Sequence, residues 1–141
     1  MSGFNIADVW EAVARAQPDS PAVIQGNRRY SWADFNRRSN GIAARLLAGP
    51  GAEHQAKVAQ YLTNSPEYLE TLFATFKAGF VPVNTNYRYT DDELVYLWEN
   101  ADAVAVVFHG TFTPTIERIR DRVPMVRTWL WVDDGSGPCP E

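Results

Sequence analysis

The chain has 141 residues, 45% of them hydrophobic, and a formal net charge of −4 at pH 7. A chain of this length fits one domain or part of one, and it has enough apolar side chains to form a packed core. The single cysteine, Cys139, excludes an internal disulfide and a metal site built from cysteines. The negative charge disfavours a nucleic-acid-binding protein, because such proteins usually carry a basic face.

Nothing in the sequence predicts a membrane span or a secretory signal. No apolar run approaches the roughly 20 residues that a membrane-spanning helix needs, and the N-terminus lacks the basic and then apolar pattern of a signal peptide. We therefore expect a cytoplasmic protein. The arginine pairs 28–29 and 37–38 suit a solvated surface. Their alternative role is contact with a phosphate or a lipid headgroup, which would bring the chain to a membrane surface.

The first part of the chain predicts two helices that flank a β-hairpin. Asn5 can cap the first helix. The apolar face of that helix is expected to comprise Ile6, Val9, Trp10 and Val13. Residues 22–31 predict the hairpin, with a turn in which Gly26 and Asn27 suit positive φ. Ser31 then caps the second helix.

The rest of the chain predicts helices that alternate with four strands. The strands are expected at Val58–Leu62, Phe80–Val83, Ala103–Phe108 and Thr128–Val132. Ser65 and Pro66 open the first intervening helix, whose buried stripe should comprise Leu69, Leu72, Phe73 and Phe76. Thr90 and Glu93 form a capping box for the next helix, and Thr113 begins the last. This order predicts an α/β fold in which a β-hairpin and helices lead into a mostly parallel sheet with helices on both faces.

Polar loops follow the carboxyl ends of the predicted strands, where open parallel sheets bind their ligands. The candidate residues there are Thr63, Asn64, Ser65, Asn84, Asn86, Arg88 and His109. Thr63 and Ser65 precede a helix N-terminus, which favours an anion, although helix capping is the favoured role. Asn84 and Asn86 are more typical of residues that shape a loop. His109 has no carboxylate or cysteine near it in the sequence, so a catalytic role is not favoured.

Two segments resemble a known family. Residues 76–84 read Phe-Lys-Ala-Gly-Phe-Val-Pro-Val-Asn, and residues 90–94 read Thr-Asp-Asp-Glu-Leu. Together they resemble the signature of the adenylate-forming superfamily, which contains acyl-CoA synthetases, adenylation domains of peptide synthetases and luciferases. Residues 30–35 are similar to its first core motif, and residues 84–89 look most like fatty-acyl-CoA synthetases. The resemblance covers nearly the whole chain.

The resemblance implies that residues 1–132 are part of the large N-terminal domain of an ATP-dependent acyl-CoA synthetase, with residues 133–141 as a loop or tail. Such an enzyme converts a carboxylate and ATP into an acyl-adenylate and pyrophosphate. CoA then displaces AMP to give a thioester. The implied cofactors of the parent enzyme are ATP, Mg²⁺ and CoA, and a fatty acid is the implied substrate.

In this family, the phosphate loop, the Mg²⁺ carboxylate, the ribose-binding aspartate and the catalytic lysine all lie downstream of the segment seen here. No position in the chain matches those motifs, so we assign no catalytic, cofactor-binding or metal-binding residue. We expect the 141-residue chain to be inactive alone, to bind none of these cofactors tightly, and to need the remainder of the synthetase as its partner. An apolar surface left uncovered would favour self-association.

Two other functional classes stay open. A free-standing flavodoxin-like module would need a phosphate-binding loop after its first parallel strand, and residues 63–66 are short for that purpose. A non-catalytic interaction domain would use the arginine pairs and aromatic residues as a docking face. Aryl or amino acid substrates, and a carrier protein in place of CoA, are also compatible with the sequence.

Overall fold

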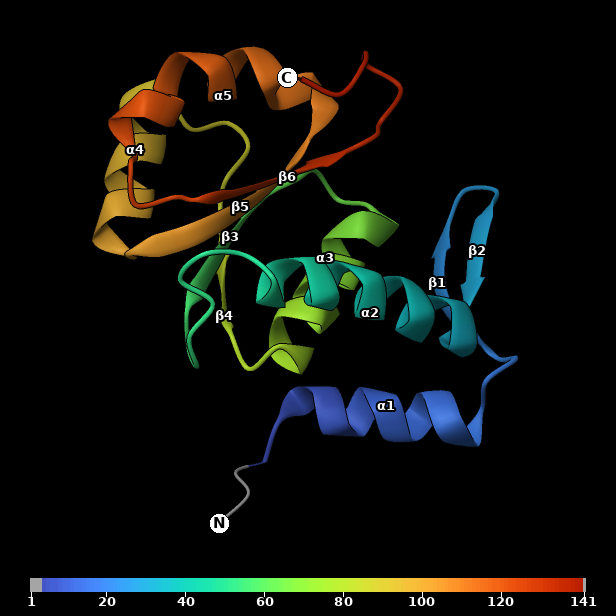
Figure 1. Cartoon of the computed structure of the whole chain (residues 1–141). Helices are drawn as coiled ribbons and strands as arrows, with labels where there is room; N and C mark the ends of the chain where they lie inside the picture. The colour runs from blue at the N-terminus through green and yellow to red at the C-terminus, as the bar shows by residue number, and fades with distance from the viewer. Residues whose placement is uncertain (1–3, 141) are drawn as a thin grey trace.

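The structure is a computed structural model that describes residues 4–140. It has the predicted α/β architecture (Figure 1). In chain order the elements are α1 (Ile6–Ala16), β1 (Pro21–Gln25), β2 (Arg28–Ser31), α2 (Trp32–Leu47), β3 (Lys57–Tyr61), α3 (Pro66–Lys77), β4 (Val81–Asn84), α4 (Asp91–Asn100), β5 (Ala103–His109), the 3₁₀ helix η1 (Gly110–Phe112), α5 (Thr113–Ile119), the 3₁₀ helix η2 (Arg120–Arg122) and β6 (Thr128–Val132).

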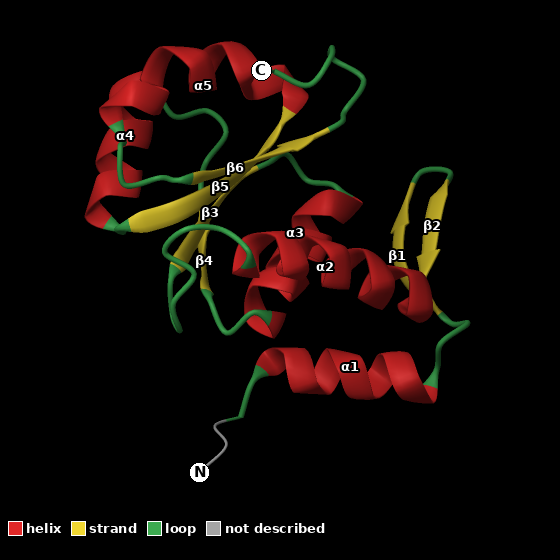
Figure 2. Ribbon diagram, viewed as in Figure 1, coloured by secondary structure: helices red, strands yellow, loops and turns green. Residues whose placement is uncertain are grey.

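The main sheet has four parallel strands in the order β4-β3-β5-β6, so β3 and β5 are central while β4 and β6 are edges. Helices α2 and α3 cover one face, and α4 and α5 cover the other (Figure 2). Strands β1 and β2 form a separate antiparallel hairpin. The prediction of a hairpin and helices leading into a parallel sheet covered on both faces is confirmed.

Side chains of the two central strands alternate between two hydrophobic clusters. The cluster under α4 and α5 includes Ala59, Tyr61, Leu94, Trp98, Val106, Phe108, Ile116 and Ile119. The cluster under α2 and α3 includes Leu46, Val58, Phe80, Ala105 and Val107. Because helices cover both faces, these strands consist of nearly continuous apolar residues instead of alternating apolar and polar ones.

A third cluster joins α1 to α2 and α3. The Trp10 ring lies 5.8 Å from the Phe35 ring and 5.1 Å from the Phe73 ring, measured between centroids. Ala7 is buried in the same cluster. The predicted apolar face of α1 was partly wrong, because Ile6 and Val9 are 46% and 44% exposed. The small side chains of Ala7 and Ala14 instead face the protein, which allows the helix to approach its neighbours closely.

Other differences from the predictions are small. Strand β3 begins and ends one residue earlier than expected, β4 one residue later, and β5 extends to His109. In the hairpin turn Gly26 has φ 56°, whereas Asn27 is not in the left-handed region. Leu69, expected in the buried stripe of α3, is 38% exposed, because the buried part of that helix is centred on Phe73 and Ala74.

The predicted caps at Asn5, Ser31, Ser65 and Thr90 are confirmed, whereas the cap expected at Thr63 was wrong, because Thr63 lies against His109 Nδ1 instead. The side chains of Asn5, Ser31 and Ser65 each accept a backbone N–H from the first turn of their helix. Thr90 and Glu93 form the expected capping box, in which the Thr90 N–H donates to the Glu93 carboxylate at 2.8 Å. Each cap typically contributes about 1 kcal/mol. No helix within residues 4–140 combines the length and the apolar character that crossing a membrane requires.

Candidate functional site

Three of the predicted strand-end residues meet beyond the carboxyl ends of β3 and β5. His109 ends β5, while Thr63 and Ser65 lie in the loop between β3 and α3. The Thr63 N–H donates to His109 Nδ1 at 3.1 Å, and the Thr63 hydroxyl lies 3.3 Å from the same nitrogen. On the other side of the ring, His109 Nε2 lies 3.5 Å from Ser65 Oγ. The imidazole therefore connects the ends of two neighbouring strands.

The surroundings of His109 favour its neutral form. The residue is 4% exposed, and this burial lowers the pKa of its imidazole, against the opposing effect of the Asp134 and Glu67 carboxylates. Since Nδ1 accepts a backbone N–H, the proton of the neutral ring is assigned to Nε2. If Nδ1 also carried a proton, its N–H would face the Thr63 N–H, and two donors would meet without an acceptor.

The same loop is held at both ends by hydrogen bonds. The Ser65 hydroxyl accepts the Tyr68 N–H at 3.2 Å, which makes Ser65 the N-cap of α3. The Asn64 carbonyl accepts a hydrogen bond from Gln25 Nε2 of the hairpin at 2.9 Å. The Ser65 hydroxyl and the Asn64 carbonyl are thus engaged within the protein.

The other candidates form a separate group after β4. The Tyr68 hydroxyl donates to Asn84 Oδ1 at 3.0 Å. Asn86 Oδ1 accepts the Arg88 N–H at 2.9 Å, which closes a local turn. The Arg88 guanidinium lies 5.6 Å from the centroid of the Tyr87 ring. These side chains shape the loop and do not converge with His109 in any hydrogen bond found within residues 4–140.

No carboxylate lies near His109 in the sequence, yet Asp134 acts on it electrostatically from the loop after β6. Burial alone would raise the pKa of Asp134, but hydrogen bonds from Ser136 and from the Thr111 N–H outweigh that effect and lower it. The sequence does not show the order of the strands in the sheet, which brings Asp134 near His109. β6 lies beside β5, so Asp134, which follows β6, and His109, which ends β5, lie at the same edge of the sheet.

The predicted arginine pairs are mostly held by carboxylates. Arg38 binds Glu70 through two hydrogen bonds, of 2.6 Å from Nε and 3.1 Å from Nη2. Arg28 forms an ion pair with Glu67, and Arg37 with Asp34. The pairs of Arg28 and Arg38 fasten the hairpin and α2 to α3, so an external phosphate or headgroup would have to compete with these carboxylates.

Neither Ser65 nor His109 is free to act on a ligand in this arrangement. Ser65 and His109 resemble a nucleophile and its base, but the serine hydroxyl caps a helix and the ring is buried. In the part of the chain that the structure describes, no three His, Cys, Asp or Glu side chains are grouped so as to hold a metal ion. The hydrogen bonds of Thr63, Ser65 and His109 instead hold the β3–α3 loop against the end of β5.

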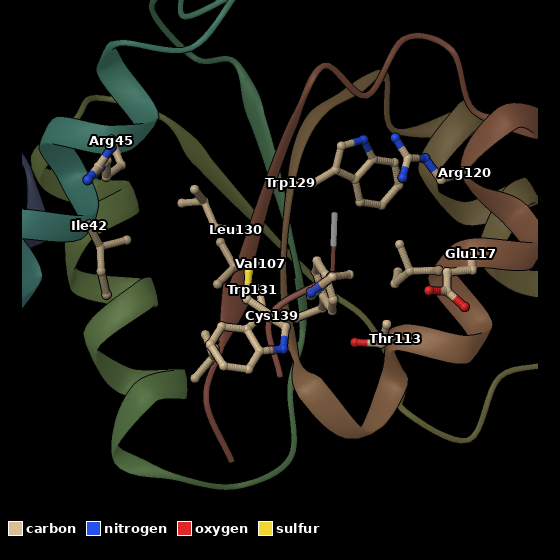
Figure 3. Close-up of a pocket in the computed structure, with 14 residues that line it drawn as sticks. Ile42, Arg45, Val107, Thr113, Glu117, Arg120, Trp129, Leu130, Trp131 and Cys139 are labelled. Carbon is tan, nitrogen blue, oxygen red and sulfur yellow. The ribbon is translucent and has the colours of Figure 1, made fainter. Parts of the chain in front are cut away.

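A groove lies elsewhere, around the free edge of β6. Its volume is about 590 Å³. Ile42 and Arg45 of α2 lie on one side of β6, and Glu117 and Arg120 lie on the other (Figure 3). We call it the β6 groove; its lining also includes Val107, Phe108, Thr113, Ile116, Trp129, Leu130, Trp131, Val132, Cys139 and Pro140.

Comparison with known proteins identifies the family. The sequence matches the family described as AMP-binding enzyme over residues 10–140. It is 35% identical to the medium-chain acyl-CoA ligase Mig of Mycobacterium avium, with 96% of this chain and 27% of that protein aligned. It is 36% identical to the medium/long-chain-fatty-acid–CoA/3-oxocholest-4-en-26-oate–CoA ligase of Mycobacterium tuberculosis, with 94% and 24% aligned.

A solved structure supports the same fold. The N-terminal domain of FACL13 from Mycobacterium tuberculosis superposes with a TM-score of 0.85 at 24% identity, covering 92% of this chain and 34% of that one. The present chain spans about a quarter of the length of the curated relatives that it matches. Since the family match covers nearly all of the sequence, the chain belongs to the AMP-binding enzyme family.

Proposed function

We propose that this chain is the N-terminal part of an ATP-dependent fatty-acyl-CoA synthetase and that it has no ligase activity by itself. The observation that carries the proposal is a family match over residues 10–140, combined with relatives of which the chain spans only about a quarter. Residues 1–132 would form part of the synthetase's large domain, and residues 133–141 a loop. The flavodoxin-like alternative is not favoured, because the matching family is a different one.

In the proposed parent enzyme, the carboxylate of a fatty acid attacks the α-phosphate of ATP and releases pyrophosphate. The thiol of CoA then attacks the acyl-adenylate and releases AMP. Enzymes of this family in general use ATP, Mg²⁺ and CoA, and we propose the same cofactors here. The named substrates of the two relatives share a carboxylate on a large apolar body, which supports a fatty acid or a comparable acid as substrate. We place the parent enzyme in the cytoplasm.

The geometry supports a structural role for this segment. Thr63, Ser65 and His109 bind one another or neighbouring backbone groups, so the carboxyl ends of β3 and β5 form a rigid edge. The remainder of the synthetase, which we propose as the chain's partner, would contribute the groups that bind ATP and metal.

Calorimetry tests the proposal. Titration of the purified chain with ATP–Mg²⁺, and then with a fatty-acyl sulfamoyl-adenosine analogue, should give no binding heat, because Thr63, Ser65 and His109 at the strand ends are already bonded within the protein. Saturable micromolar binding would contradict the proposed inert segment. As a separate check, the DNA that follows codon 141 should encode a Ser/Thr/Gly-rich phosphate loop that contains a lysine. If no such phosphate loop is encoded there, the proposal that this chain is part of a larger synthetase would be contradicted.

A further inference from the structure

We propose that the β6 groove is a docking site for a second copy of this chain, in which the two β6 strands pair antiparallel. Two four-stranded sheets would then join into one continuous sheet. This inference concerns the isolated chain and does not depend on the proposed ligase function.

The two edges of the sheet differ in how they are protected. At the β4 edge, Pro82 has no N–H to donate to an added strand, and the strand ends after Asn84. The β6 edge reads Thr-Trp-Leu-Trp-Val, with neither a proline nor a charge. Charged residues, prolines and bulges are the usual means by which an edge strand is kept from pairing with another chain. Of the two edges of the four-stranded sheet, β6 is therefore the one open to strand addition.

The groove has the shape that an added strand requires. It extends over the edge of β6 onto both faces of the sheet, between α2 and α5 (Figure 3). Val107, Leu130 and Val132 line it on the α2 side, whereas Phe108, Trp129 and Trp131 line it on the α5 side. A strand placed there could bury alternate side chains against each wall. Cys139 and Pro140 of the tail also line the groove.

β6 is complementary to itself. In an antiparallel pair centred on Leu130, the two-fold axis is perpendicular to the sheet, so each helical layer meets its own copy. Trp129 of one copy then lies opposite Trp131 of the other, and Thr128 lies opposite Val132. Cross-strand aromatic pairs of this kind stabilise antiparallel sheets.

The charges on the α5 side are complementary in the same arrangement. Glu117 and Arg120 line the groove, and neither forms an ion pair with another of the described residues. The two-fold axis sets the two α5 helices in opposite directions, so Glu117 of each copy faces Arg120 of the other. Arg45, which is exposed on the α2 side, faces its own copy across solvent, where salt screens the repulsion.

A strand from the remainder of a longer synthetase is the competing occupant of this groove. The 141-residue chain distinguishes the two occupants, because it contains no such remainder. If only the remainder fits, the isolated chain stays monomeric.

Sedimentation velocity over a wide concentration range provides the test, on the Cys139→Ser chain under reducing conditions to exclude an intermolecular disulfide. We expect a species of twice the 15.9 kDa monomer mass that increases with concentration. Val132→Lys should abolish it by placing a charge in the interface. Glu117→Arg and Arg120→Glu should each weaken dimerisation about tenfold, and the double charge swap should restore it. Glu99→Arg, an exposed change outside the groove, is the matched control.

Hydrogen exchange locates the contact. Backbone amides of β6 should exchange more slowly at dimeric concentrations than at monomeric ones, whereas those of β4 should not change. A monomer at every concentration would overturn the proposal. A dimer that is unaffected by Val132→Lys and by the charge reversals would overturn it as well.

Discussion

His109 shows how a single buried side chain can make stability depend on pH. Its imidazole is 4% exposed and accepts a backbone hydrogen bond from Thr63. Burial lowers its pKa in the folded state below the value near 6.5 of an exposed histidine. The unfolded chain therefore binds a proton at a higher pH than the folded chain does.

The sign of the effect follows from this difference. Well above pH 6.5 both states are neutral at this position, so this histidine does not reduce the stability of the folded chain. As the pH falls below about 6.5, the unfolded state takes up the proton first and the free energy of unfolding decreases, by at most about 1.4 kcal/mol per pH unit. Urea unfolding at several pH values should show this decrease. This decrease should become smaller in His109→Gln. It should remain in His54→Gln, which changes an exposed histidine. If the pH dependence in His109→Gln is unchanged, His109 is not its source.

The ion pair of Arg38 and Glu70 should matter more than those on the surface. Glu70 is 2% exposed and binds Arg38 through both carboxylate oxygens. Glu70→Gln should lower the free energy of unfolding by about 1–3 kcal/mol, because it removes a charge-assisted bond from a buried group. Asp92→Asn, which alters an exposed pair with Arg122, should cost less than about 1 kcal/mol. Equal losses in urea denaturation would show that burial does not decide the strength of these pairs.

At the scale of the elements, two glycines have opposite roles. Gly79 ends α3 with φ 73°, and an added Cβ would lie 3.2 Å from His54 Nδ1. Gly41 lies inside α2, where a Cβ would meet nothing within 4 Å. Gly79→Ala should therefore destabilise the protein by about 1–2 kcal/mol, whereas Gly41→Ala should stabilise it by roughly 0.5–1 kcal/mol. Thermal unfolding of the two variants should show shifts of opposite sign; a stabilising Gly79→Ala would contradict the structural role of that glycine.

Most of the elements could be predicted from local signals. Ser65 with Pro66, Thr90 with Glu93, and Gly79 each mark a helix end through interactions within a few residues. The boundaries of β3 and β4 were displaced by one residue, because an apolar run shows where a strand is buried and not where its pairing ends. The exposure of Ile6 followed from the rotation of α1 against α2 and α3, which the sequence of the helix alone does not determine.

The site was only partly predictable. Because the carboxyl ends of parallel strands lie at the same edge of a sheet, the sequence predicted that Thr63, Ser65 and His109 lie near one another. In the structure they are joined by hydrogen bonds or close contacts. The role of Asp134 depends on the position of β6 beside β5, and the pairing of Arg38 with Glu70 connects α2 to α3. Contacts between distant segments leave no periodic signal in a sequence, so these partners became visible only in the folded chain.

At the scale of the whole molecule, the two edges of the four-stranded sheet differ in whether another strand can pair with them. Pro82 protects the β4 side, whereas β6 has an uncharged strand beside a groove of about 590 Å³. The chain also spans only about a quarter of the curated relatives that it matches. The open edge is the one at which we propose that a second copy of the chain pairs.

The order of the strands also affects how the chain can fold during synthesis. Lys57 of β3 pairs with Ala103 of β5, and α3, β4 and α4 all lie between them in the chain. Local helices and the hairpin can form as they leave the ribosome, but the centre of the sheet cannot close until β5 has emerged. Pairings between distant segments slow folding and leave apolar surface exposed for longer. The nascent chain would thus pass through a stage in which β3 is paired with β4 alone and its other edge is available to chaperones.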